Sequence, residues 1–61
     1  MSRGLFAAKD IMVMVANAKT LDDLVQAEKF FDVERHFMST MMERASRTRL
    51  DAALERIAAT T

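Results

Sequence analysis

Residues 18–31 read AKTLDDLVQAEKFF, and this stretch decides how the chain divides into helices. Thr20 precedes a helical pattern, and its hydroxyl can accept a hydrogen bond from the backbone N–H groups that a helix leaves free at its start. Asp23, three residues later, lies in the first turn, where negative charge is favoured. The stretch therefore predicts a helix over about 21–31. Its apolar face comprises Leu21, Leu24, Val25, Ala27 and Phe31, with Phe30 at the edge.

The segment before this start signal predicts another helix, over about 5–18. Val13 and Met14 widen its apolar stripe, so most of its circumference is expected to contact other residues. Gly4 is the only glycine and the chain has no proline, so nothing after position 4 forces a break. The stripe recurs at steps of three and four and consists of Leu5, Ala8, Ile11, Met12, Val15 and Ala18.

The C-terminal half carries two apolar stripes that differ in phase. The first predicts a helix over about 33–46, with Asp32 as a candidate cap for a break near 31–33. The second predicts a helix over about 48–58. Either Thr48 caps this short fourth helix, or one long helix turns its two halves towards different partners. The first stripe is Val33, Phe37, Met38, Met41, Met42 and Ala45, and the second is Leu50, Ala53, Leu54, Ile57 and Ala58.

Length and composition predict one all-α domain over residues 1–61, a small bundle of three helices, or of four if the chain breaks near Thr48. Residues of high helix propensity dominate, and alternating β-branched runs are missing. A chain of 61 residues buries only about 60% of its unfolded surface, and this one has no cysteine for a disulfide. We therefore expect the bundle to be completed by self-association or by a partner.

The same composition predicts a cytoplasmic protein. The longest apolar run, Ile11 to Ala16, has six residues, whereas a membrane-spanning helix needs about 20. Only Arg3 precedes the first apolar stretch, and no small-residue cleavage site of the kind found in secretory signals follows it. We expect neither a membrane span nor a secretory signal.

His36 is the only imidazole, and the residues around it allow two tests for chemistry. On a continuous helix Asp32 and Ser39 would lie near His36, but a working triad also needs a loop that stabilises the oxyanion, which a glycine-poor helical chain lacks. Glu28 would share a stripe with Asp32 and His36, but three ligands from one helix leave a metal site open. We expect no enzyme, no metal site and no cofactor, and interpret His36 as a surface or interface residue.

Charge is distributed unevenly although nine basic side chains balance nine acidic ones. Residues 20–34 have a net charge of −4 and residues 35–49 one of +3. Two oppositely charged patches could orient a partner, although charges on helices are commonly just solvated. A neutral chain with few arginines favours at most an indirect contact with nucleic acid. The patch residues are Asp22, Asp23, Arg35, Arg44, Arg47 and Arg49.

Methionine and phenylalanine are concentrated in the middle of the chain. Methionine is flexible and polarisable, and it is over-used where a surface adapts to a partner. Two interpretations remain open: these residues form the core between short helices, or they form an exposed groove or a homodimer seam. The candidate partner-binding residues are Phe30, Phe37, Met38, Met41 and Met42.

Residues 10–24, DIMVMVANAKTLDDL, resemble the first helix and the second-helix start of the Hha/YmoA family of small nucleoid-modulating proteins. Residues 44–49, RASRTR, are similar to that family's Ala-Asp-His-Arg segment. The chain departs from the family at Met14–Asn17, where members carry arginines, at Thr48, where they carry histidine, and in lacking a tryptophan-bearing C-terminal segment. The resemblance implies a non-enzymatic adaptor that binds the dimerisation region of an H-NS-type silencer.

These observations together predict a small regulator or adaptor that acts by protein–protein interaction and self-associates, with a role in transcription regulation if the resemblance holds. The alternatives are a small structural subunit of a larger assembly, including a phage particle, and a weakly DNA-associated helical dimer. A regulator is expected to exchange partners in solution, whereas a structural subunit is expected to behave poorly in isolation.

Overall fold

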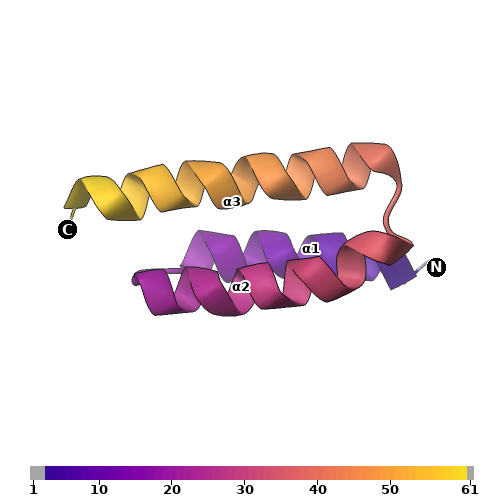
Figure 1. Ribbon diagram of the computed structural model, residues 1–61, viewed down its shortest axis with the longest axis horizontal. Helices are drawn as coiled ribbons and strands as arrows, with labels where there is room; N and C mark the ends of the chain where they lie inside the picture. Colours follow the sequence, from indigo (N-terminus) through magenta and orange to yellow (C-terminus); the bar gives the residue numbers. More distant parts are fainter. Residues whose placement is uncertain (1–2, 61) are drawn as a thin grey trace.

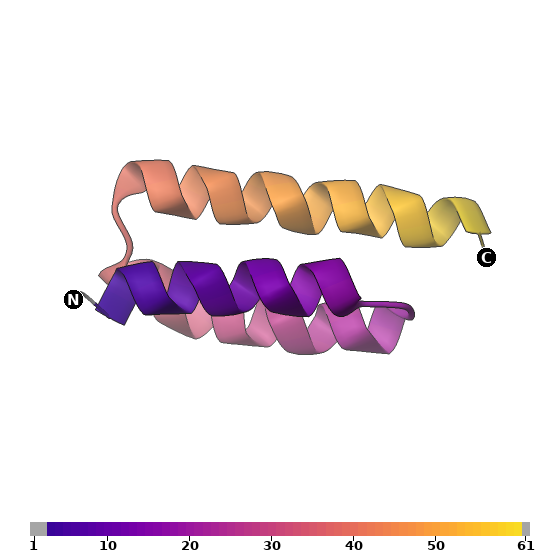
Figure 2. The same cartoon turned by 180° about the vertical axis from the view of Figure 1, so that it is seen from behind.

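The computed structural model describes residues 3–60 as a bundle of three helices. They are α1 (Arg3–Asn17), α2 (Leu21–Glu34) and α3 (Thr40–Thr60), and a short 3-10 turn, η1 (Arg35–Phe37), joins α2 to α3. Figure 1 shows that α1 and α3 run in the same direction and α2 runs against both. The reverse view in Figure 2 shows the C-terminal turns of α3 extending beyond the α1–α2 loop. The chain is therefore all-α, as its composition predicts.

The start of α2 forms as the sequence predicts. The backbone N–H of Asp23 donates to the Thr20 hydroxyl at 3.3 Å, and the Thr20 N–H donates to the Asp23 carboxylate at 3.1 Å. The N–H of Lys19 donates to the same carboxylate oxygen at 2.9 Å. This reciprocal pair of bonds satisfies donors that would otherwise lack partners at the helix start.

Most helix boundaries differ from those expected. α1 covers 3–17 instead of 5–18, and α2 continues to Glu34 instead of ending at residue 31. The break falls at 35–39, and α3 starts after Ser39, whose hydroxyl accepts the Met42 N–H at 3.2 Å. The helix expected over 33–46 is therefore replaced by the end of α2, η1 and the start of α3.

α3 is one helix of 21 residues, so the fourth helix expected over 48–58 does not form. Thr48 is exposed in the middle of α3 and caps nothing. The inward-facing residues continue without a break across this position, at Ser46, Leu50, Ala53 and Ile57. Because their steps of four, three and four keep one helical phase, both halves of α3 turn the same side towards the core.

The apolar core closes within a single chain. Ile11 and Ala27 are fully buried and Phe31 is 1% exposed. Ser46, also fully buried, donates its hydroxyl to the Met38 sulfur at 4.0 Å. Each helix supplies residues to the core, which comprises Ile11, Val15, Ala18, Leu24, Ala27, Phe31, Leu50, Ala53 and Ile57.

Arginines hold both ends of α1. At its start, the Arg3 guanidinium donates to the Glu34 carboxylate at 2.9 to 3.2 Å and lies 4.0 Å from the centre of the Phe37 ring. At its end, Arg56 of α3 donates to the carbonyl oxygens of Val15 and Ala18 at 3.3 Å. The second contact places a cation at the C-terminus of α1, where the helix dipole favours positive charge.

Among residues 3–60, no helix is both long enough and apolar enough to cross a lipid bilayer.

Candidate protein-interaction surface

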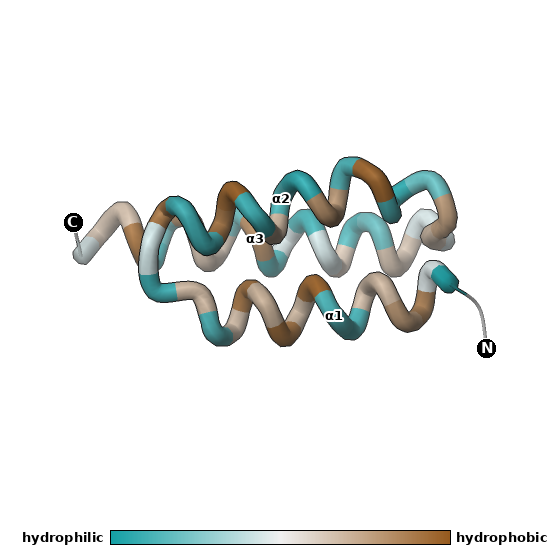
Figure 3. The backbone as a smooth tube through the Cα atoms, turned by 90° about the horizontal axis from the view of Figure 1, so that it is seen from below, coloured by the Kyte–Doolittle hydropathy of each residue, from teal (hydrophilic) through white to brown (hydrophobic). Residues whose placement is uncertain are grey.

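Large apolar side chains remain on the surface after the core has closed. Their exposed fractions range from 38% at Leu5 to 83% at Met41. Figure 3 shows apolar colouring along most of α1 and more hydrophilic colouring along α2. Exposed apolar residues that stand singly are ordinary, whereas a contiguous group of them marks a contact surface. They are Leu5, Phe6, Val13, Leu21, Val25, Val33, Phe37, Met41 and Leu54.

Two of the candidate partner-binding residues lie near one end of the bundle. Phe37 is 52% exposed on η1, under the Arg3 guanidinium, and Phe30 is partly buried against the core. Phe6 lies one turn after Arg3 on α1 and is 48% exposed. We call Phe6, Phe30 and Phe37 the phenylalanine end. Phe6 was not among the residues singled out from the sequence, because its position falls outside the inward-facing stripe of α1.

The three candidate methionines do not share one surface. Met38 lies in the link between η1 and α3 and packs against the core. Met42 is half-buried on α3, whereas its neighbour Met41 faces solvent. Successive helical residues point about 100° apart, so Met41 and Met42 lie on different sides of α3. Met38 therefore belongs with the core and Met41 with the surface.

The charged residues partly neutralise one another within the fold. Arg47 of α3 pairs with Glu28 of α2 at 3.9 Å, and Arg35 pairs with Glu43 at 3.3 Å. The Arg47 guanidinium also lies 4.8 Å from the centre of the buried Phe31 ring. The two Arg47 contacts join the acidic segment 20–34 to the basic segment 35–49, whereas the Arg35–Glu43 pair lies within the basic segment.

The remaining members of the predicted charged patch have different surroundings. Asp23 is engaged in the cap of α2, where hydrogen bonds from the Lys19 and Thr20 backbone lower the pKa of its carboxyl. Asp22, Arg44 and Arg49 are exposed. Asp22 lies at the start of α2, whereas Arg44 and Arg49 lie on α3, so these residues do not form one continuous patch.

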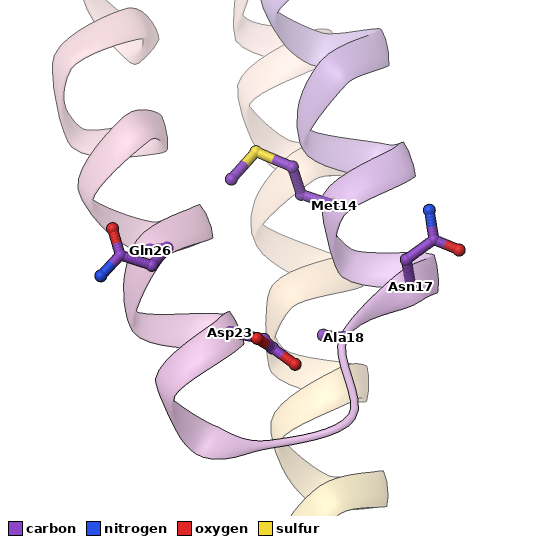
Figure 4. Close-up of a pocket in the computed structure, with 5 residues that line it drawn as sticks. All are labelled: Met14, Asn17, Ala18, Asp23 and Gln26. Carbon is purple, nitrogen blue, oxygen red and sulfur yellow. The ribbon is translucent and has the colours of Figure 1, made fainter.

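His36, the acidic side chains and the open pockets are the other candidate sites within residues 3–60. His36 is exposed on η1, and no group of three His, Asp or Glu side chains within residues 3–60 could hold a metal ion. An open pocket of about 240 Å³ lies at the α1–α2 loop. Figure 4 shows its lining residues, Met14, Asn17, Ala18, Asp23 and Gln26. The Asp23 carboxylate in this pocket already caps α2, and a second open pocket of about 310 Å³ is lined by Lys19, Thr20, Leu21 and Asp22 of the same loop and helix start. We therefore take the apolar surface as the candidate functional site.

Comparison of the chain with protein-family models, curated proteins and solved structures found no match. The resemblance to the Hha/YmoA family stays a prediction.

Proposed function

We propose that this protein is a small, non-enzymatic regulator or adaptor that acts by protein–protein contact and associates with itself. The observation that carries this proposal is the exposure of nine large apolar residues on a bundle whose core is already closed. Stable folding of one chain does not require these residues to be exposed, and water contact with them is unfavourable. Burial against another protein removes that contact.

The phenylalanine end is the surface that we assign to a partner protein. Aromatic residues and arginine are enriched in protein interfaces. Here the Phe37 ring lies 4.0 Å from the Arg3 guanidinium, and the half-exposed Phe6 follows Arg3 by one helical turn. The Glu34 carboxylate fixes the Arg3 guanidinium, so little side-chain entropy remains to be lost when a partner docks. A preorganised apolar surface of this kind favours binding over catalysis.

Self-association is tested by measuring mass with light scattering across a hundredfold dilution series, with helicity followed by circular dichroism on the same samples. We expect a mass above 6.9 kDa at the highest concentration, which falls on dilution while the helicity stays constant. One mass of 6.9 kDa at every concentration would contradict self-association. Loss of helix on dilution would show instead that a single chain does not hold its fold.

A partner surface at the phenylalanine end is tested with an apolar fluorescent dye that brightens on exposed aromatic surface. We expect the dye to bind the wild-type monomer, and to bind the double variant Phe6→Gln, Phe37→Gln less than a control double variant, Leu21→Gln, Leu54→Gln. Leu21 and Leu54 are 47% and 49% exposed, close to the 48% and 52% of Phe6 and Phe37, so the control removes two similarly exposed large apolar side chains elsewhere. Equal dye binding by both variants would contradict a special role for this end.

A further inference from the structure

One side of α3 is turned away from the rest of its own chain. The core residues Ser46, Leu50, Ala53 and Ile57 define the inner side of the helix. The Arg47–Glu28 ion pair shows which flank of α3 faces α2, and the Arg56 contacts with Val15 and Ala18 show which flank faces α1. The remaining side carries exposed residues at Met41, Arg44, Ala45, Thr48, Asp51, Ala52, Glu55 and Ala59.

The outer side of α3 has the spacing of a helix-packing surface. Met41, Ala45, Thr48 and Ala52 follow one another at steps of four, three and four, the steps by which one helix packs into the side of another. Met41 is the most exposed large apolar residue named above, at 83%. Each alanine leaves space beside it that a long side chain from a facing helix can fill.

The sizes of these residues match when the facing helix is a second copy of α3 running in the opposite direction. In that arrangement Met41 lies against the partner's Ala52, and Ala45 lies against the partner's Thr48. Two-fold symmetry repeats each contact, because Met41 of each copy then meets Ala52 of the other copy. The same face thus serves both chains.

Charge supports the same orientation. Arg44 and Asp51 are seven residues apart, two turns along the same edge of the outer side, and both are exposed. Within residues 3–60 neither forms an ion pair. An antiparallel pair brings Arg44 of each copy beside the partner's Asp51. In a parallel pair, the edge that carries these two residues faces the opposite edge of the partner helix, so the two charges do not meet.

We propose that two copies of this chain form a symmetric dimer through antiparallel packing of residues 41–52 of α3, with Met41 against the partner's Ala52 and Arg44 beside the partner's Asp51. This inference rests on the self-association in the proposed function and specifies its surface. Residues 41–52 span about 17 Å of helix. A contact of that length buries less than the roughly 800 Å² per partner of a stable interface. We therefore expect a weak dimer that exchanges in solution, which leaves the phenylalanine end free for another protein.

The test exchanges the two charges. Arg44→Asp, Asp51→Arg and the double variant are compared with the wild-type chain by sedimentation equilibrium, from about 1 µM to about 1 mM. Each single variant creates two like-charge contacts in a symmetric dimer, so we expect its dimer Kd to rise about tenfold. The double variant restores both contacts with the signs reversed, and we expect its Kd to return to within about threefold of wild type.

Two further variants test whether the effect is specific to the outer side of α3. Lys29→Glu on the exposed side of α2 changes the net charge by as much as Arg44→Asp does, and we expect it to leave the dimer Kd unchanged. Met41 is already exposed in the single chain, so we expect Met41→Gln to keep normal helicity. The variant removes the long apolar side chain that packs against the partner's Ala52, so we expect a weaker dimer. A helicity check by circular dichroism accompanies every variant.

The outcomes separate this inference from the proposed function. If the wild-type chain associates but the charge variants retain its affinity, or the double variant fails to recover it, the α3 pairing is wrong and self-association stands. If the wild-type chain is monomeric at every concentration, self-association itself fails. Weakening by both single variants, with recovery in the double variant, is the result that the α3 pairing predicts.

Discussion

Gly4 is the residue at which the fold tolerates no side chain. It is buried in the first turn of α1, and a Cβ placed on it would collide with the carbonyl oxygen of Phe37 and lie 3.0 Å from the Cα of Met38. The missing side chain therefore lets α1 pass directly against the backbone of η1. Glycine is used here for close approach of two backbone segments.

Replacing Gly4 with alanine is expected to destabilise the protein. At an exposed helical position Gly→Ala stabilises by up to about 1 kcal/mol, but overpacking against backbone costs about 1–3 kcal/mol. We expect the second effect to dominate, so that urea unfolding of Gly4→Ala gives a lower free energy of unfolding than wild type. A gain in stability would show that η1 does not pack against Gly4.

Asp23 gives the stability of the bundle a dependence on pH. Because two backbone N–H groups hold the pKa of its carboxyl below the ordinary value of about 3.9, the folded state favours the charged form. The stabilisation is present above that ordinary value and is lost as the pH falls through the lower pKa of the folded state.

We therefore expect Asp23→Asn to have a lower melting temperature than wild type at neutral pH. The difference between the two should shrink as the pH is lowered below about 4, because the wild-type carboxyl then becomes neutral too. Asp22→Asn, which alters a neighbouring exposed carboxyl, serves as the control. A difference in melting temperature that stays constant down to pH 2 would contradict the role of the charge.

Among the helices, α1 is held at both ends by arginine contacts. Arg3 of α1 binds Glu34 of α2, and Arg56 of α3 binds the C-terminal carbonyl groups of α1. Glu34 is only 8% exposed, so loss of Arg3 leaves a buried carboxylate with fewer hydrogen-bond donors. We expect Arg3→Ala to lower the free energy of unfolding by about 1 kcal/mol, a value reduced by the exposure of the Arg3 side chain.

Thermal melts of Arg3→Ala and of Arg49→Ala provide the comparison. Arg49 is exposed on α3 and has no ion pair with a described residue, so its removal is expected to change stability little. Equal melting temperatures for the two variants would mean that the Arg3–Glu34 contact does not hold α1 in place.

The helix boundaries show which parts of the fold could be predicted from the sequence. The α2 start was predictable because both partners of the cap, Thr20 and Asp23, lie within four residues. The break at 35–39 was not, because it depends on contacts of Gly4 and Arg3 with η1 and Glu34, more than thirty residues away. Thr48 gave a false start signal, since a local cap pattern says nothing about the continuous inner face of α3.

The candidate surface was predictable only in part for the same reason. The sequence identified Met41 as a candidate partner-binding residue. Whether its side chain faces the core or solvent depends on where α3 begins. Met38, from the same stripe, lies before that start and packs against the core. Phe6 was missed, because no local signal separates an outward phenylalanine from ordinary surface residues.

At the scale of the whole molecule, one chain provides its own core despite its small size. Phe31 of α2 has the largest of the fully buried side chains among residues 3–60, and the Arg47 guanidinium lies over its ring. A domain of this length has a small margin of stability, so a single large cavity is expected to unfold it.

Phe31→Ala is expected to cost about 3–5 kcal/mol and to abolish most helicity at 37 °C. Phe6→Ala is the matched control, since it removes the same atoms from a half-exposed position and should leave the helical signal intact. Circular dichroism of both variants at one concentration checks this. A folded Phe31→Ala variant would contradict the position of Phe31 at the core.

One chain holds the core of the bundle, and we propose that the outer side of α3 meets a second copy. Amide nitrogen–proton NMR spectra across a dilution series test both statements together, because they report on every residue at once. We expect concentration-dependent shifts confined to residues near 41–52, with Leu24, Ala27 and Phe31 unchanged. Shifts that spread through those core residues, or that are absent from α3 while the mass of the protein changes, would contradict this expectation.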